Sequence, residues 1–221
     1  MFTGLVEEVG VVRRLERTGG GARLVVGAET VLEGLRMGDS ISVSGTCLTV
    51  VATRRGEFAV ECMPETLSRT TIGSMNQGGE VNLERSLAWG DRMGGHLVMG
   101  HVDAVVAASN VSRRGIALEV TFSLPESVRA FVAAKGSVAV DGVSLTVIEV
   151  DDKTFTVGLI PHTVANTTLR SVKRGTQVNL EADIIARYVY QAVRGSHRDD
   201  DASGEPTAGL TEELLRDKGF V

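Results

Sequence analysis

Short runs of alternating apolar and polar residues fill most of the first 183 positions, a pattern typical of β-strands separated by turns. In the first part of the chain this pattern predicts strands over Gly4–Leu15, Ala22–Gly27, Asp39–Ala52, Glu57–Met63 and Glu80–Leu83. Hairpin turns are expected at Arg54–Gly56 and Asp151–Lys153, and short helices at Thr30–Leu35 and Pro125–Ala134. The chain is therefore expected to be mainly β.

The same pattern occurs twice along the chain. Ser40–Glu84 aligns without a gap with Ser137–Glu181, and about 18 of the 45 positions are identical. The N-terminal Met1–Gly10 aligns more loosely with Val98–Ala107 at the same spacing of 97. Two copies of one β-rich unit predict two tandem Greek-key six-stranded β-barrels, since closure removes exposed strand edges. The N-terminal barrel is expected at residues 1–97 and the C-terminal barrel at residues 98–183.

Beyond the second copy the apolar period changes from that of a strand to that of a helix. The apolar positions at helical spacing are Ile184, Ile185, Tyr188, Val189, Ala192 and Val193. They predict a helix over residues 184–195, ended by Gly195, whose apolar stripe either packs on a barrel or joins helices of other subunits. Residues 196–221 are expected to form a flexible acidic tail, in which Thr211 could cap a short helix through Lys218.

The third predicted strand of each copy changes phase at a glycine. In the first copy the apolar positions follow one phase before Gly45 and the other phase after it, which indicates a bulge or a bend. If Leu48 and Val50 then face the barrel interior, their polar neighbours face outward. The side chains predicted to face outward in the two copies are Cys47, Thr49, Ser144 and Thr146.

Composition and charge argue against several classes of protein. A net charge of -5 and an aromatic content of 4% do not suit a nucleic-acid-binding protein. No apolar run reaches the roughly 18 residues that span a bilayer, and Met1–Gly10 lacks the features of a signal peptide. Two cysteines without an export signal indicate free thiols in a reducing cytoplasm. A Cys47–Cys62 disulfide is disfavoured, as is a zinc site that adds His96 and His101.

Six motifs in a fixed order resemble one known family. They are MFTG, GTCLTV, GGHLVMGHVD, DGVSLTV, IPHT and the paired VNLE, and the resemblance to riboflavin synthase of the two-barrel type extends from Met1 to about Arg194. It implies that two molecules of 6,7-dimethyl-8-ribityllumazine are converted to riboflavin and 5-amino-6-ribitylaminouracil. A four-carbon unit passes between the two substrates without a metal or an organic cofactor.

The resemblance also implies an assembly. The family forms a homotrimer through its C-terminal helix, and each active site lies between the N-barrel of one subunit and the C-barrel of its neighbour. No nucleic acid and no membrane is implied as a partner, and an association with lumazine synthase stays open. A non-catalytic antenna protein that binds lumazine or flavin in the same duplicated barrel is the alternative. Ligand-facing side chains retained in both copies argue against it.

Two substrate pockets follow from the resemblance. The N-barrel pocket would use Gly4, Leu5, Val6, Cys47, Leu48, Thr49, Glu61, Cys62, Met63, Pro64, Glu65 and Thr66. The C-barrel pocket would use Gly100, His101, Val102, Lys135, Ser144, Leu145, Thr146, Leu159, Ile160, Pro161, His162, Thr163 and Val164. Main-chain groups of these segments would bind the uracil-like edge of the ring, and Thr, Ser and Lys side chains the ribityl hydroxyls.

Directional transfer requires two unequal pockets, so residues that differ between the copies are the catalytic candidates. The reaction needs a base for the methyl proton at C7, a nucleophile or water for the other ring, and acids for the leaving amines. His101, which aligns with Gly4, is the candidate proton shuttle. Cys47 is either a nucleophile or a weak donor, and Ser144 is expected to pair with Asp183.

Two further histidines complete the expectations. His96 follows Gly95 and is expected to be structural. His162 stands where many members of the family carry an acidic residue, as Glu65 does in the first copy, so a role for a carboxylate there is in doubt.

Overall fold

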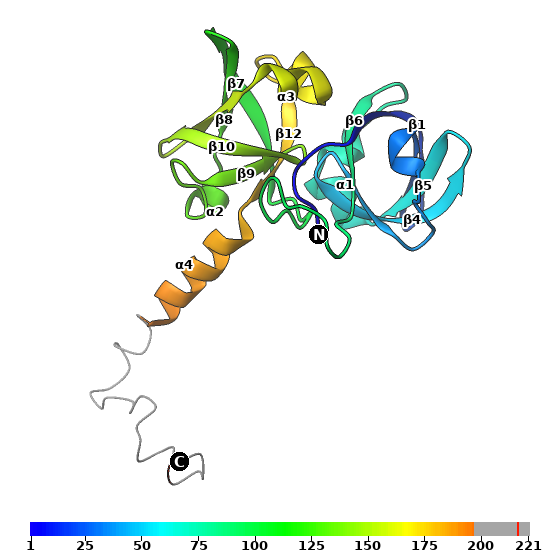
Figure 1. Ribbon diagram of the computed structural model, residues 1–221, viewed down its shortest axis with the longest axis horizontal. Helices are drawn as coiled ribbons and strands as arrows, with labels where there is room; N and C mark the ends of the chain where they lie inside the picture. Colours follow the sequence, from blue (N-terminus) through cyan, green and yellow to red (C-terminus); the bar gives the residue numbers. More distant parts are fainter. Residues whose placement is uncertain (197–215, 217–221) are drawn as a thin grey trace.

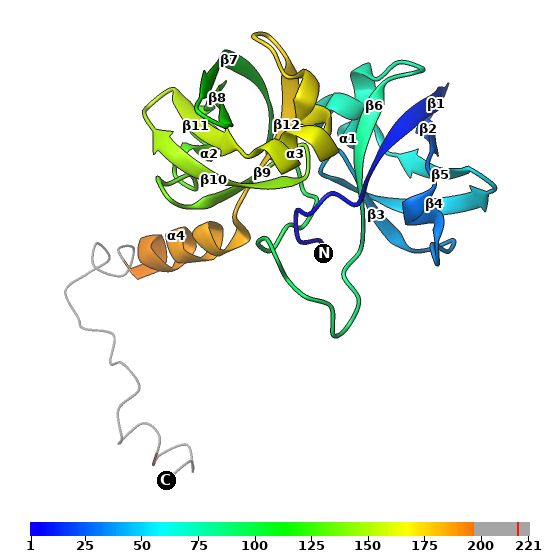
Figure 2. The same cartoon turned by 45° about the horizontal axis from the view of Figure 1, so that its top comes forward.

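The computed structural model describes residues 1–196 and Arg216 of the 221-residue chain. Two closed six-stranded antiparallel barrels lie side by side, and a helix extends away from the second barrel (Figures 1 and 2). The predicted mainly β fold with two tandem barrels and a C-terminal helix is therefore confirmed. The predicted tail and its short helix fall outside the described residues, apart from Ser196 and Arg216.

The two barrels have the same strand order. The first contains β1 (Glu8–Thr18), β2 (Gly21–Gly27), β3 (Ser40–Val43), β4 (Thr46–Arg54), β5 (Glu57–Cys62) and β6 (Glu80–Arg85). The second contains β7 (Ala104–Arg114), β8 (Ala117–Ser123), β9 (Ser137–Val140), β10 (Val143–Val150), β11 (Thr154–Leu159) and β12 (Gln177–Ala182). The first closes as β1-β2-β5-β4-β3-β6, and β7 to β12 repeat this order.

The single strand predicted over Asp39–Ala52 is wrong, because the chain reverses direction between β3 and β4. Ser44 and Gly45 have φ values of 44° and 78°, as expected for the central residues of a type I′ hairpin turn. Asp141 and Gly142, with φ values of 45° and 77°, make the same turn in the second copy. The phase change at the glycine thus marks a tight hairpin. A bulge lies further along β4, between Val50 and Ala52.

The short helices also differ from the expectation. The structure has a 3-10 turn at Thr30–Leu32 and a single helical turn, α2, at Glu126–Arg129, so both are shorter than predicted. Two helices that were not predicted follow β5 and β11: α1 (Pro64–Arg69) and α3 (Pro161–Asn166), each with proline in its first turn. A 3-10 turn follows each of them, at Thr71–Ser74 and Thr168–Ser171.

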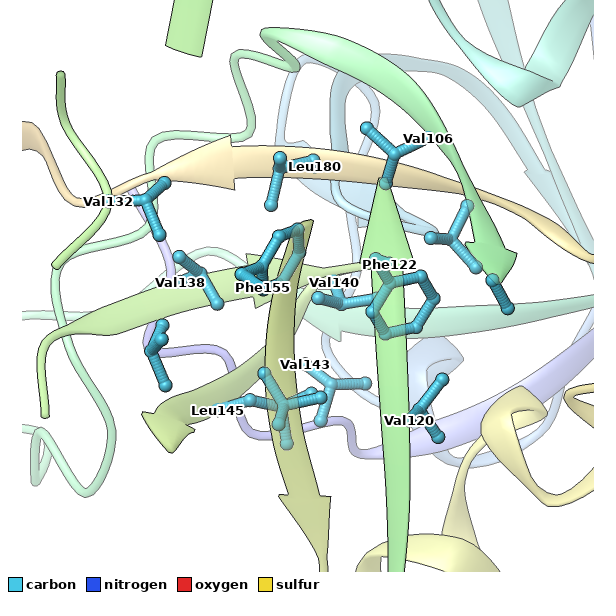
Figure 3. Packing of buried hydrophobic residues seen from close by; sticks show 14 of the residues in the cluster. Val106, Val120, Phe122, Val132, Val138, Val140, Val143, Leu145, Phe155 and Leu180 are labelled. Atoms are coloured by element: carbon cyan, nitrogen blue, oxygen red, sulfur yellow. The ribbon is translucent and has the colours of Figure 1, made fainter. Parts of the chain in front are cut away.

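Each barrel is filled by its own apolar core. In the second barrel the rings of Phe122 and Phe155 stack with centroids 5.5 Å apart, among branched side chains from several strands (Figure 3). Leu48 and Val50 are buried in the first core at 5% and 1% exposure, whereas Thr49 between them is exposed. The prediction that Thr49 and Thr146 face away from the barrel interior is confirmed, and Cys47 and Ser144 are half-buried.

The two barrels meet about an approximate two-fold axis at their β3–β4 and β9–β10 hairpins. A Cβ atom added to Gly45 would lie 2.6 Å from the backbone nitrogen of Gly142, so neither turn can carry a side chain there. The buried amide of Asn82 reaches across from β6. It donates to the carbonyl oxygen of Asp141 (2.9 Å) and accepts from the backbone N–H of Thr168 (2.8 Å).

Asn179, the repeat counterpart of Asn82, makes the reciprocal bonds from the second barrel. Its Nδ2 donates to the carbonyl oxygen of Ser44 (2.7 Å) and to Oγ1 of Thr71 (2.9 Å), and its Oδ1 accepts from the Thr71 N–H (2.8 Å). Both asparagines are at most 2% exposed. They connect the two barrels through buried hydrogen bonds that leave little freedom of rotation.

The C-terminal helix α4 (Ile184–Ser196) contacts the second barrel on one side only. Arg187 pairs with Asp103 and lies over the ring of Phe131, which also meets Tyr190 edge to face. The large apolar residues that remain exposed on α4 are Ile185, Tyr188, Val189 and Val193. Gly195 lies within the helix and does not end it. Among the described residues, no helix combines the length and apolar character needed to cross a membrane.

Candidate active site

Two short segments cross from one barrel to the other. We call residues 1–7 the N-arm and residues 97–103 the connector arm. The carbonyl oxygen of Gly4 in the N-arm accepts from the N–H of Ser144 in the second barrel (2.8 Å). The carbonyl oxygen of Gly100 in the connector arm accepts from the N–H of Cys47 in the first barrel (2.9 Å). The expected pockets, which grouped Gly4 with Cys47 and Gly100 with Ser144, are therefore wrong in this respect.

Other contacts of the N-arm also place it against the second barrel, so the two arms are exchanged between the barrels. Val6 packs against the core of the second barrel. A groove of about 500 Å³ lies between the arm and α3, and Val6, Glu8, His162 and Arg170 are among the residues that line it. Residues 4–6 thus lie with the Ser144 strand and with His162, which belong to the second barrel.

The arms also correct the alignment of the two copies. Gly4 and Gly100 both have a φ of 77° and make equivalent hydrogen bonds, so the spacing here is 96 and not 97. His101 is therefore the counterpart of Leu5, and the expected opposition of His101 and Gly4 is wrong. Both glycines are required by close approach: a Cβ atom at Gly4 would lie 2.6 Å from Cβ of Ser144.

The residues expected to bind substrate regroup accordingly into two candidate composite sites, which we name after Ser144 and Cys47. The Ser144 site contains Gly4, Leu5, Val6, Lys135, Ser144, Leu145, Thr146, Leu159, Ile160, Pro161, His162, Thr163 and Val164. The Cys47 site contains Gly100, His101, Val102, Cys47, Leu48, Thr49, Glu61, Cys62, Met63, Pro64, Glu65 and Thr66. The side chains of Leu48, Cys62, Leu145 and Leu159 are buried in the barrel cores, so these residues offer only main-chain groups to a ligand.

Exposed apolar side chains border both sites. Leu5 (51%) and Ile160 (58%) belong to the Ser144 site, and Met63 (67%) belongs to the Cys47 site. Large apolar side chains at this exposure suit contact with a flat ring. A larger cavity of about 690 Å³ lies beside the N-arm; Leu5, Ser40 and Ser86 border it, but residues 47–49 and 144–146 do not.

Ser144 has a partner that the sequence did not indicate. Its hydroxyl lies 2.7 Å from Nδ1 of His96. Burial lowers the pKa of the His96 imidazole, against a smaller opposing effect from the charge of Asp183, so the ring is neutral near pH 7. Its Nε2 has no hydrogen-bond partner among the described residues. A neutral imidazole in contact with a hydroxyl can accept or return a proton, so His96 joins the candidate catalytic groups.

Asp183 does not form the expected pair with Ser144. Its carboxylate accepts from the N–H of Ile185 (2.9 Å) and caps the start of α4. Its charge still acts on His96. Asp183 therefore lies near the site and affects it electrostatically. The sequence signal that could have revealed His96 is the preceding Gly95. The backbone passes Ser144 so closely there that an added Cβ would lie 3.0 Å from Cβ of Ser144.

The two cysteines occupy different environments. Cys47 is half-buried and packs against the small apolar cluster of Phe2, Val98 and Ala139. Cys62 is buried in the first core, where burial raises the pKa of its thiol to about 11. A thiol with that pKa stays protonated and cannot act as a nucleophile near pH 7. Within residues 1–196, no three His, Cys, Asp or Glu side chains converge as they would to hold a metal ion.

The family to which these features belong is shown by comparison with known proteins. The lumazine-binding domain family matches residues 3–86 and 99–183, so the chain is a protein with two lumazine-binding domains. It is 37% identical to the riboflavin synthase of Actinobacillus pleuropneumoniae and 36% identical to that of Bacillus subtilis, over 100% of each chain. It is 44% identical to that of Mycobacterium tuberculosis, over 89% of this chain and 100% of the relative. The chain belongs to the riboflavin synthase family.

Solved structures share the fold at lower identity. LumP complexed with 6,7-dimethyl-8-(1'-D-ribityl) lumazine is 22% identical, with a TM-score of 0.74, over 82% of this chain and 99% of that one. LumP complexed with riboflavin is also 22% identical over the same shares, with a TM-score of 0.77. These likenesses establish the pair of barrels independently of the sequence motifs.

Proposed function

We propose that the protein catalyses the dismutation of two molecules of 6,7-dimethyl-8-ribityllumazine to riboflavin and 5-amino-6-ribitylaminouracil. The observation that carries this proposal is the pair of composite sites, each made of an outward-facing polar strand of one barrel and an arm from the other half of the chain. The reaction consumes two identical substrates, and a duplicated site provides a place for each. Exposed Thr49 and Thr146 present hydroxyls to a ribityl chain in equivalent positions.

The differences between the two sites give the transfer a direction. His101 stands where the other site has Leu5, and Cys47 where the other has Ser144. In the proposed reaction His101 carries a proton in the Cys47 site, and Cys47 acts as nucleophile or weak donor there. In the Ser144 site the hydroxyl of Ser144 exchanges a proton with His96, and the charge of Asp183 stabilises the protonated ring.

We further propose that α4 joins three copies of the chain into a homotrimer. Its stripe of Ile185, Tyr188, Val189 and Val193 is more than half exposed at every position, which favours burial against another chain. A chain ended at Asp183 should sediment as a monomer with weakened activity. A truncated chain that sediments as an intact trimer would exclude this role of α4. The free thiols of Cys47 and Cys62 suit a reducing cytoplasm, where we place the reaction.

The test of the proposed activity uses purified protein and 6,7-dimethyl-8-ribityllumazine alone, without added metal or cofactor. Flavin absorption should rise as the uracil product forms in equal amount. An antenna protein would bind the lumazine and form no flavin. Calorimetry with riboflavin should resolve two sites of unequal affinity in each chain, whereas one site would favour the antenna reading.

A further inference from the structure

We propose that Glu84 and Glu181 are crossed positioning residues: each carboxylate is anchored in one barrel and holds the arm that completes the site of the other barrel. For its effects on catalysis the proposal rests on the proposed function. Its structural part does not, since it concerns where each arm is held. The two glutamates end the paired VNLE segments that mark the duplication.

Glu84 lies on β6 of the first barrel and binds the N-arm. Its Oε1 accepts from the N–H of Thr3 (2.6 Å) and from the Thr3 hydroxyl (2.7 Å), and its Oε2 accepts from the N–H of Gly4 (3.0 Å). The next group along the arm is the Gly4 carbonyl, which accepts from Ser144. One carboxylate of the first barrel thus fixes the peptide that borders the Ser144 site of the second.

Glu181 lies on β12 of the second barrel and binds the connector arm in the same way. Its Oε1 accepts from the N–H of Met99 (2.7 Å), and its Oε2 accepts from the N–H groups of Gly100 (2.9 Å) and His101 (3.1 Å). The Gly100 carbonyl in turn accepts from Cys47 of the first barrel. Glu181 therefore positions the backbone of His101, the residue that distinguishes the Cys47 site.

Both carboxylates are buried, at 6% and 5% exposure, and within residues 1–196 neither forms an ion pair with a basic side chain. The N–H and hydroxyl donors of the arms therefore compensate part of the buried charge, while burial still raises the pKa of both carboxyls. Charge-assisted hydrogen bonds of this kind are roughly twice as strong as neutral ones and hold a fixed geometry. A buried glutamate without an ion pair is destabilising unless its oxygens accept hydrogen bonds, and here the arms supply those bonds.

The variants Glu84→Gln and Glu181→Gln test the proposal. Glutamine keeps the size of the side chain but replaces one acceptor oxygen by an NH2 group that faces an N–H donor. Glu149→Gln is the control, because Glu149 is an exposed strand glutamate, on β10, and forms no ion pair within residues 1–196. All measurements are made on the full chain at pH 8.

Hydrogen exchange measured by mass spectrometry reports the arms directly. Glu84→Gln should speed exchange at least 10-fold in residues 2–5 and at Ser144, and leave residues 98–102 and Cys47 as in the wild type. Glu181→Gln should give the opposite pattern, and Glu149→Gln should change exchange in neither arm. The proposal would be overturned if either variant sped exchange equally in both arms, or if it sped exchange in neither arm. This measurement needs no catalytic activity.

Binding of riboflavin, measured by calorimetry, tests the crossing. Thr146→Ala identifies the step that belongs to the Ser144 site, and Thr49→Ala the step that belongs to the Cys47 site. Glu84→Gln should weaken by about 10-fold the same binding step that Thr146→Ala weakens, and change the affinity of the other step less than 2-fold. Glu181→Gln should weaken the binding step that Thr49→Ala weakens. Weaker riboflavin binding at the site on the glutamate's own barrel would refute the crossed arrangement.

Turnover separates this proposal from the proposed function. If the wild type forms riboflavin, each Gln variant should raise KM or lower kcat at least 10-fold, while its unfolding midpoint shows that the barrels remain folded. If the wild type forms no riboflavin but the crossed patterns of hydrogen exchange and binding are observed, the proposed enzymatic activity is refuted. The positioning role of the two glutamates is then still supported.

Discussion

The buried amide of Asn179 connects the two barrels, and the substitution Asn179→Ala removes three hydrogen bonds at once. Each such bond contributes about 1 kcal/mol net, and burying the abandoned partners adds to the loss, so we expect a cost of about 3–5 kcal/mol. Asn82→Ala removes two bonds and should cost about 2–3 kcal/mol. For a chain of this size 1 kcal/mol corresponds to roughly 2–4 °C in Tm, so Asn179→Ala should lower Tm by about 6 °C or more.

Urea unfolding followed by circular dichroism measures these costs. Fluorescence is less suitable because Trp89, the one tryptophan of the chain, is fully exposed and senses little of the fold. Asn110→Ala, an exposed asparagine on β7, is the control and should change the free energy of unfolding by less than about 0.5 kcal/mol. An Asn179→Ala chain within about 0.5 kcal/mol of the wild type would refute the idea that these bonds fix the barrels.

Three further predictions follow from the sites. His96→Gln should lower kcat at least 10-fold, because the proton partner of Ser144 is lost, with riboflavin affinity changed less than 3-fold; unchanged kcat would exclude the role. Gly100→Ala should destabilise the fold by about 1–2 kcal/mol through its φ of 77°, and more through contact with Cys47; a stable variant with normal binding at that site would contradict this. Burial raises the pKa of Glu181 to about 7, despite three N–H donors that lower it, so between about pH 4.5 and 7 the native state holds a proton that the unfolded chain has lost. The free energy of unfolding should therefore fall as pH rises through that window, and Glu181→Gln should flatten this part of the curve; an unchanged slope would show that Glu181 does not titrate there.

The sequence predicted what depends on local periodicity. The two barrels and the outward direction of Thr49 follow from alternating positions and their repetition, and the structure confirms both. The hairpin at Ser44–Gly45 was missed because a phase change at a glycine has two causes, and positive φ at a serine leaves no trace in the pattern. The helix α1 was missed because six residues are too few to show a helical period.

The sites depended on contacts that no local pattern contains. The ungapped alignment of Ser40–Glu84 with its copy hid the one-residue difference between β8 and β9, so His101 was matched with the wrong residue. Buried glutamates such as Glu84 look like surface residues in a sequence, because only the fold shows that an arm covers them. The contact between His96 and Ser144 joins positions 48 residues apart and required the three-dimensional structure.

The exchange of arms has a consequence for how such a molecule arose. The backbone groups of Phe2 and Val98 bond to each other, as two copies of one position meet across a two-fold axis. A polypeptide with a single copy of the unit would have reproduced this arrangement by pairing with an identical molecule, each lending its first residues to the other. Joining two such copies in one chain would keep the exchanged segments within a single molecule. It would also allow the two halves to differ, as they do at the equivalent positions of Leu5 and His101.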